Sequence, residues 1–410
     1  MSSFLYHLLA FWLFINYNNA QAANTECPIK SYQELVKCLE KAASPIKIVE
    51  QNLLATKHLE HIAHKLINPE LEAESFSKGS TTSETSATLL FTLPLGNKRS
   101  ANITAAQGEI KKSTAERDEV SQQTRLEIIL TLYRLSQIQN EILIEKESTE
   151  TFAKIISQFE KRPVLTPEQN VSLAVFKMAL ADHQLKLTSI KSFEEKLYQS
   201  LNAISQVKRE LIEKNLPTRK LTWPEIKENK TDHDLSPSTR KALAEVEIAE
   251  SLAVKARAEA WPDLKLGPTL RSTKESSATD TYIGISFNIS LPVFNRNSGH
   301  ISFFEQKKVS ASLALEQVKN TESSTRNQLV HKYYKTVQAL KGTLSLNTIN
   351  ENHSQIEKQF FKGLVSSALV IEAHRQLIDL EGRRNTAELE AIEALGKILT
   401  IDNQFQEEIL

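Results

Sequence analysis

The stretch TYIGISFNISLPVFNRNSGH, from Thr281 to His300, joins two kinds of pattern at a proline. Before Pro292, apolar residues take every odd position from Ile283, and small or polar residues take most of the even ones. A period of two is typical of a strand with one apolar and one polar face. After the proline the pattern becomes helical and stays so to the C-terminus. One clean amphipathic strand is therefore predicted inside a chain that is otherwise mostly helical.

A second copy of this junction lies earlier in the chain. LPLGNKRS, which begins at Leu93, resembles LPVFNRNS, which begins at Leu291. In the same way QFEK at Gln158 resembles QFFK at Gln359. We therefore predict two internal repeats, each with the order helix, β-hairpin, long helix and return helix. They cover residues 44–214 and 237–401, followed by a tail at 402–410.

The prolines mark where the long helices can run. The sequence has no proline between Pro94 and Pro163, and none after Pro292. A helix without proline can continue without a kink, so we expect long helices over about 97–162 and 297–362. At ~1.5 Å per residue each would be about 100 Å long. Helices of that length need partners along their whole surface.

The return helices, expected over about 167–214 and 369–401, carry a coiled-coil pattern. Apolar and small residues step by three and four along each of them, which is typical of a heptad seam. The first seam comprises Val171, Ala174, Met178, Ala181 and Leu185, and the second comprises Val370, Ala373, Leu377, Leu380, Ala387, Ala391, Ala394 and Ile398. We expect both seams to pack against neighbouring helices.

Four strands are predicted, two in each hairpin, with the hairpins at about 69–95 and 262–293. Polar residues recur on one face of these strands, and we expect them to line a water-filled pore: Glu70, Glu72, Glu74, Ser286 and Asn288. The three glutamates could give such a pore a preference for cations, or could simply make its lining hydrophilic. Strands of about ten residues with one polar and one apolar face are typical of membrane barrels. Four strands cannot close a barrel, so the barrel must be shared among copies of the chain.

The N-terminus has the features of an export signal over residues 1–22. The apolar core LLAFWLFI, from Leu8 to Ile15, is too short to span a bilayer, and Ala20-Gln21-Ala22 forms a cleavage site. The following segment, 23–43, holds both cysteines of the sequence, Cys27 and Cys38. In an exported chain we expect a disulfide between them, the alternative being two free thiols.

These motifs together resemble the TolC-like outer membrane efflux family. The resemblance is carried by LPLGNKRS, ISLPVFNRNSG and FFKGLVSSALVIEAHRQL, and LPVFNRNSG is particularly similar to the heavy-metal, CzcC-like branch. It implies a mostly α fold with a small β part, assembled as a homotrimer. Three copies would form a twelve-stranded transmembrane β-barrel in the outer membrane of a Gram-negative cell, continued by a periplasmic α-helical barrel. Residues 215–236 would form an irregular equatorial linker.

The resemblance also implies where the entrance lies and what the duct meets there. The helical breaks near 162–169 and 362–370 would be the periplasmic tips, which meet an adaptor protein and through it an inner-membrane pump. Glu372 matches an acidic entrance position, with an ordinary solvated helix charge as the alternative. Phe360 matches a gate aromatic. Gly363 interrupts the helix where a reversal needs a positive φ.

Other classes of function find little support in the sequence. The net charge is zero, with 50 residues of each sign, so nothing suggests nucleic-acid binding. No phosphate-binding loop, zinc-ligand spacing or nucleophile elbow is present, so we expect neither an enzyme nor a cofactor. His58, His61 and His64 recur on one predicted helix, but an exposed face explains them better than a metal site. The exported substrate is expected to be heavy-metal cations, with drugs or secreted proteins as alternatives. A periplasmic adaptor is a less favoured reading.

Overall fold

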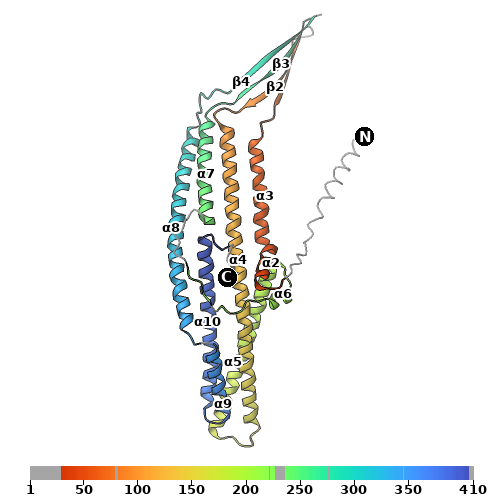
Figure 1. The fold of residues 1–410 in the computed structure, drawn as a ribbon. Coiled ribbons are helices and arrows are strands. Elements are labelled where there is room, and N and C mark those ends of the chain that lie inside the picture. Colours follow the sequence, from red (N-terminus) through yellow and green to blue (C-terminus); the bar gives the residue numbers. More distant parts are fainter. Residues whose placement is uncertain are drawn as a thin grey trace, which may run out of the picture.

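A computed structural model describes residues 29–78, 82–220, 222–226, 236–275, 278–344 and 346–405. Long helices make up most of these residues, and a small four-stranded sheet lies at one end of an elongated body (Figure 1). The predicted signal segment, 1–22, lies outside the described residues. Within the described part of the chain, no helix has both the length and the hydropathy needed to cross a bilayer.

The central element of the body is α4 (Lys98–Glu160), a single helix of 63 residues. At ~1.5 Å per residue it is about 95 Å long and runs almost the full height of the helical part. It contacts α3 (Ser44–His64) and α7 (Pro237–Ala258) in the half nearer the sheet. In the other half it contacts α5 (Pro167–Ser205) and α10 (Ser367–Ile401). The shorter helices therefore cover successive halves of the long one.

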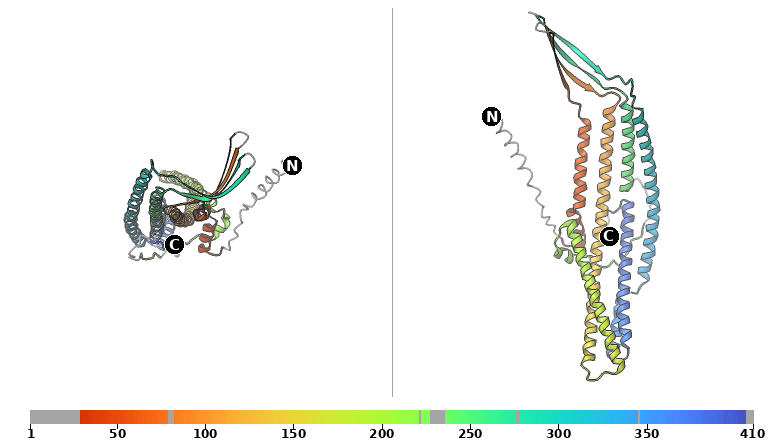
Figure 2. Two further views of the ribbon diagram at one scale, coloured as in Figure 1. Left: turned by 90° about the horizontal axis from the view of Figure 1, so that it is seen from above. Right: turned by 180° about the vertical axis from the view of Figure 1, so that it is seen from behind.

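The remaining helices flank this arrangement. Helix α8 (Ser298–Gly342) lies along both α7 and α10, and α9 (Leu346–Phe361) packs on α10 (Figure 2). Two short helices, α2 (Tyr32–Ala42) and α6 (Arg209–Lys214), lie beside the middle of α4 (Figure 1). The described residues of the predicted linker carry no helix or strand after Lys214 and pack on α4, α8 and α10.

Both long helices begin after an asparagine in the left-handed conformation. The φ angle is 67° at Asn97 and 60° at Asn297. Asparagine tolerates this conformation better than most residues with a side chain, so it suits a sharp change from strand direction to helix axis. At the first junction Lys98 forms an ion pair with Asp263, with 2.7 Å between Nζ and Oδ1. This pair ties the start of α4 to the residue before strand β3 (Leu264–Glu275).

Two of the predicted helices are in fact broken. The helix expected over 297–362 ends as α8 at Gly342, and α9 begins at Leu346. Thr343 has extended backbone angles, and its hydroxyl donates to the carbonyl of Leu340, which ends the helix. The return helix expected over 167–214 is divided into α5 and α6, because Gln206 adopts a left-handed conformation. Neither break involves a proline.

The strands are β1 (Glu70–Lys78), β2 (Thr82–Leu93), β3 (Leu264–Glu275) and β4 (Ala278–Ile289). They form one antiparallel sheet in the order β1-β2-β3-β4, so the two predicted hairpins are joined through pairing of β2 with β3. The last strand ends at Ile289, short of the predicted 293. Pro292 lies just beyond and has no N–H to donate to a neighbouring strand.

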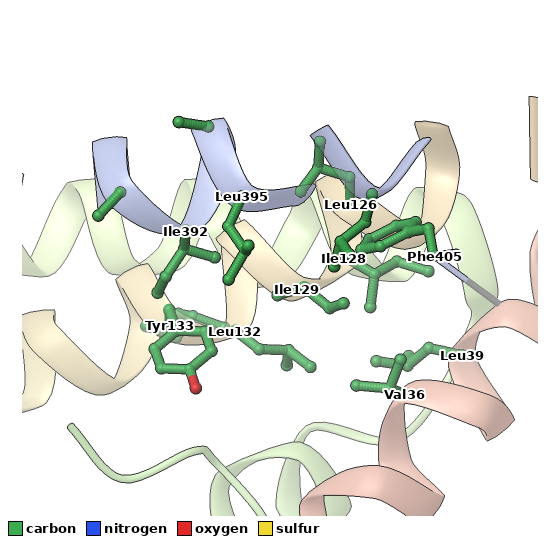
Figure 3. Close-up of a cluster of buried hydrophobic side chains, with 14 of the residues drawn as sticks. Val36, Leu39, Leu126, Ile128, Ile129, Leu132, Tyr133, Ile392, Leu395 and Phe405 are labelled. Atoms are coloured by element: carbon green, nitrogen blue, oxygen red, sulfur yellow. The ribbon is translucent and has the colours of Figure 1, made fainter. Parts of the chain in front are cut away.

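The largest hydrophobic core lies at the middle of the body, where α4 passes between α2 and α10 (Figure 3). Most of its side chains come from three parts of the chain, namely α2, α4, and α10 with the residues that follow it. They include Val36, Leu39, Leu126, Ile129, Leu132, Tyr133, Ile392, Leu395 and Phe405. Burial of each large aliphatic side chain contributes about 1.5–3 kcal/mol. This core fixes α2 and the chain end after α10 against the central helix.

The two heptad seams differ in their surroundings. In the second, Val370, Ala391 and Ile398 are each no more than 1% exposed and pack inside the chain. In the first, Val171 and Leu185 are 64% and 73% exposed, so the expected packing does not occur within one chain. A period of three and four shows that a helix has an apolar face. It does not show whether the partner belongs to the same chain.

Candidate functional site: the two faces of the sheet and the distal helix end

One face of the sheet, called here the apolar face, carries a continuous apolar band over the part nearer the helices. Residues directly opposite each other in antiparallel strands project to the same side, so the register assigns every side chain to a face. The apolar band comprises Leu71, Ala73, Ala87, Leu89, Phe91, Leu93, Leu264, Leu266, Pro268, Leu270, Ile283, Ile285, Phe287 and Ile289. Toward the hairpin turns the same face becomes polar, beginning with the row Ser75, Thr85, Ser272 and Thr281. In a single chain Ile283 is 84% exposed and Phe287 is 71% exposed. An apolar surface of this kind needs an apolar environment.

The opposite face of the sheet is polar. It includes Glu70, Glu72, Glu74, Glu84, Ser86, Thr88, Lys265, Thr269, Arg271, Tyr282, Ser286 and Asn288, with Phe76, Leu90 and two glycines among them. The structure thus places all five predicted pore-lining residues on one face, with the glutamates on one edge strand and Ser286 and Asn288 on the other. Their role in lining a pore stays a prediction.

Ion pairs and hydrogen bonds link the strands across the polar face. Lys265 Nζ lies 2.6 Å from Glu70 Oε2, and Arg271 Nε lies 3.0 Å from the Glu84 carboxylate. These two pairs balance the charge of two glutamates. By contrast, the residues directly opposite Glu72 and Glu74 on β2 are Thr88 and Ser86, which carry a hydroxyl group and no charge.

A very close backbone approach joins the two hairpins. A Cβ atom added at Gly267 would lie 1.7 Å from the carbonyl oxygen of Leu89, a distance at which no side-chain carbon fits. The next residue, Leu90, lies opposite Gly267 on the polar face and is only 1% exposed. Strands β2 and β3 can therefore pair here only because position 267 has no side chain.

At the other end of the molecule the chain reverses between α9 and α10. Gly363 has a φ of 75°, its N–H donates to the carbonyl of Phe360 at 2.8 Å, and the N–H of Leu364 donates to Gln359 at 3.0 Å. Such bonds close a helix C-terminus with a left-handed residue, where glycine carries no steric cost. The predicted left-handed reversal at Gly363 is confirmed.

Phe360 packs inside this distal end. Its ring lies 5.8 Å from that of Phe176 on α5, in a T-shaped arrangement. It borders the second buried cluster, which comprises Phe152, Ile155, Ile156, Phe176 and Val370. Phe360 thus connects the end of α9 to α4 and α5. The gate role implied for it stays a prediction.

Glu372 forms a compact charge pair near the start of α10. Its carboxylate accepts hydrogen bonds from Arg375 Nε at 2.9 Å, Arg375 Nη2 at 2.7 Å and Gln376 Nε2 at 2.8 Å. The hydrogen bond from Arg375 is the main reason that the pKa of Glu372 is lowered. The negative charge is therefore retained, but Arg375 balances it within the same chain.

The remaining predicted residues lie apart from both regions. His58, His61 and His64 are on α3, with the first two rings 6.2 Å apart. Cys38 is buried on α2 and held in a disulfide. Cys27 lies outside the described residues, so its pairing with Cys38 stays a prediction.

Sequence reasoning missed a buried group where α9 packs on α10. His353, Glu357 and His374 place one ligand atom each within 4.8 Å of one another. The i,i+4 spacing of His353 and Glu357 on α9 could have indicated two members of this group from the sequence, since residues at that spacing share a helix face. The third member lies on another helix, and its approach depends on tertiary packing.

Comparison with known proteins agrees with this architecture. No protein-family profile matches the chain. The cobalt-zinc-cadmium resistance protein CzcC of Cupriavidus metallidurans is 23% identical over 274 residues, which is 65% of this chain and 64% of that protein, just under two thirds of its length.

Two solved structures with a similar fold are outer membrane channels. CmeC of Campylobacter jejuni superposes with a TM-score of 0.71 and 13% identity, over 92% of this chain and 87% of that one. The open state of MtrE of Neisseria gonorrhoeae gives a TM-score of 0.71 and 12% identity, over 91% and 89%. Both of these similar proteins are channels, not enzymes. This chain thus has the fold of the TolC-like outer membrane channels, and its sequence resembles the CzcC-like branch of that family.

Proposed function

We propose that this chain is the outer membrane duct of a tripartite efflux system and acts as a homotrimer. The observation that supports it most strongly is the sheet, whose four strands in the described residues carry a continuous apolar band on one face and polar side chains on the other. An apolar face suits lipid and a polar face suits a water-filled lumen. The helical part would extend through the periplasm, with the distal end of α5, α9 and α10 furthest from the membrane.

An assembly of three copies would cover the sheet edges and the apolar helix surfaces that a single chain leaves exposed. Strands β1 and β4 form the edges of the sheet, and an open edge in lipid costs several kcal/mol for each unsatisfied backbone group. Joined edge to edge, three sheets give a closed twelve-stranded barrel. The helical part also offers exposed apolar side chains for contacts between copies, among them Val171, Met178 and Leu185 on α5 and Phe303, Val309 and Leu313 on α8.

The proposed substrate is a heavy-metal cation. Support comes from the sequence similarity to CzcC, a cobalt-zinc-cadmium resistance protein. A periplasmic adaptor and an inner-membrane pump would complete the system at the distal end. Drug efflux and type I protein secretion use ducts of the same fold, and are the alternatives for the substrate.

Two experiments test the assembly and the substrate separately. Native mass spectrometry of the protein extracted from outer membranes in mild detergent should show a trimer, and a stable monomer would contradict the proposal. A deletion strain should lose tolerance to Co²⁺, Zn²⁺ or Cd²⁺ and keep its tolerance to drugs. The opposite pattern would leave the duct in place and make drugs its substrate.

We predict that Glu372→Gln lowers the cation preference of the channel. The substitution removes one carboxylate per chain and leaves Arg375 paired with Asp379 alone, at 3.5 Å, so the net charge near the distal end of the trimer becomes more positive by three. Arg375→Gln is the matched variant and should shift ion preference in the opposite direction. Reversal potentials in planar bilayers under a salt gradient measure both effects. Identical values for the native protein and both variants would show that this charge pair lies away from the conduction path.

A further inference from the structure

A buried group of imidazole and carboxylate side chains lies between α9 and α10. His353 and Glu357 stand one turn apart on α9, and His374 faces them from α10. The exposed fraction is 8% for His353 and 1% for His374, and the Glu357 side chain is 21% exposed. Burial of two imidazoles and a carboxylate together is costly unless their polar atoms have partners.

The three ligand atoms are close enough to share one metal ion. His374 Nε2 lies 3.2 Å from Glu357 Oε1, close to the separation of about 3.3 Å between two ligand atoms bound tetrahedrally to zinc. His353 Nε2 lies 3.3 Å from His374 Nε2 and 3.4 Å from His374 Nδ1, and the two rings are nearly perpendicular, at 86°. The His353 ring must therefore rotate to direct its lone pair at an ion held by the other two residues.

One tautomer of His374 leaves its Nε2 free of a proton. In that tautomer His374 Nδ1–H donates to Ser148 Oγ at 2.9 Å, and the Ser148 hydroxyl donates to the carbonyl of Ile144 at 3.0 Å. The lone pair of Nε2 then faces the carboxylate oxygen of Glu357 at 3.2 Å, and a cation between these two acceptors removes their repulsion.

The surroundings resemble the outer shell of a metal site. A metal-binding histidine usually donates its second N–H to an oxygen, and Ser148 Oγ lies 2.9 Å from His374 Nδ1, where it can accept that bond. Thr151 Oγ1 donates to Glu357 Oε1 at 3.2 Å, which orients the carboxylate.

We propose that His353, Glu357 and His374 bind one divalent transition-metal ion per chain, zinc being the type that fits best. Two imidazole nitrogens and one carboxylate oxygen suit zinc and its neighbours in the first transition row, whereas Ca²⁺ and Mg²⁺ prefer oxygen ligands. A fourth position is left for water.

The ion can reach this group from outside the chain. His353 and Glu357 line a cavity of about 540 Å³ whose wall also includes the acidic residues Glu147 and Glu381. Once bound, the ion would connect α9 to α10. The proposal concerns a resident ion in the wall of the helical part and does not depend on what the duct carries.

The test is a titration of the purified full chain in detergent with Zn²⁺ alone, in competition with a chromophoric chelator. One site per chain is expected in the native protein. Loss of an outer-shell partner typically lowers metal affinity 10- to 100-fold, so His374→Gln and Glu357→Gln should each lower it at least about 100-fold. Ser148→Ala should lower it about 10-fold.

A triple variant in which His58, His61 and His64 become Gln is the matched control, because it removes three histidines from α3 and leaves the proposed site intact. It should bind Zn²⁺ like the native protein. Loss of the site in this control, or native affinity in both His374→Gln and Glu357→Gln, would overturn the proposal.

A second set of measurements uses only the native protein, so misfolding of a variant cannot affect its result. The native protein loaded with Co²⁺ should give the visible absorption of a four-coordinate site with nitrogen and oxygen ligands. Zn²⁺ should also slow amide hydrogen exchange in α9 more than in α3. A six-coordinate spectrum with unchanged exchange in α9 would show that the ion binds elsewhere on the protein.

Discussion

Ile285→Arg is expected to remove most of the assembled protein from the outer membrane, whereas Ser286→Arg is expected to leave most of it. These adjacent residues lie at the same depth but on opposite faces of the sheet. Ile285 is on the apolar face opposite Pro268, and Ser286 is on the polar face opposite Gly267. An arginine facing lipid near the midplane costs about 2–4 kcal/mol, and three copies would multiply the effect.

The amount of heat-resistant oligomer in outer membrane fractions measures this prediction. Phe287→Arg should give a similar loss, because Ile285 and Phe287 are the two central residues of the apolar run Ile283, Ile285, Phe287 and Ile289 on β4. Asn288 is a poorer control than Ser286, since an arginine there would stand opposite Lys265. Equal losses from Ile285→Arg and Ser286→Arg would contradict the assignment of the faces.

Gly267→Ala is the second substitution from which we expect a large effect. Its new Cβ would lie 1.7 Å from the Leu89 carbonyl oxygen and 2.8 Å from the carbonyl carbon, and both atoms belong to the backbone of β2. A backbone cannot move aside as a side chain can, so the substitution must separate β2 from β3. We expect a cost of about 3 kcal/mol.

Gly284→Ala supplies the matched control in the same sheet. A Cβ at Gly284 would lie 3.3 Å from the Thr269 methyl group, which a small rotation relieves. Urea unfolding of the protein refolded into detergent micelles should show a large loss of stability for Gly267→Ala and little change for Gly284→Ala. A native midpoint for Gly267→Ala would mean that β2 and β3 pair in a different register.

The sequence predicted those parts of the fold that local chemistry determines. Alternation around Phe287 indicated the strands, and the prolines indicated where α4 could run unbroken. The repeated motifs LPLGNKRS and LPVFNRNS marked both strand-to-helix junctions, and Gly363 marked the distal reversal. Each of these signals comes from the conformational limits of one residue or from a period along one segment, so it can be read without knowledge of tertiary contacts.

The sequence did not predict other features of the structure, because they depend on tertiary packing or because their sequence signal is weak. Gly342 and Thr343 end α8 without any proline, and attention to proline alone missed them. The exposed face that includes Val171 has the same period as a buried one, so its environment could not be deduced. The approach of His374 to His353 requires the crossing of α9 and α10, which the spacing along the chain does not encode.

The contrast between α4 and the pair α8 and α9 has a mechanical consequence. Helix α4 is one stiff rod from the sheet to the distal turn, so a sideways push at one end is passed to the other with little loss. The second long segment is interrupted after Gly342, where α8 ends and Thr343 has extended backbone angles. Strain imposed on the distal end would thus bend this segment at the interruption more readily than it bends α4.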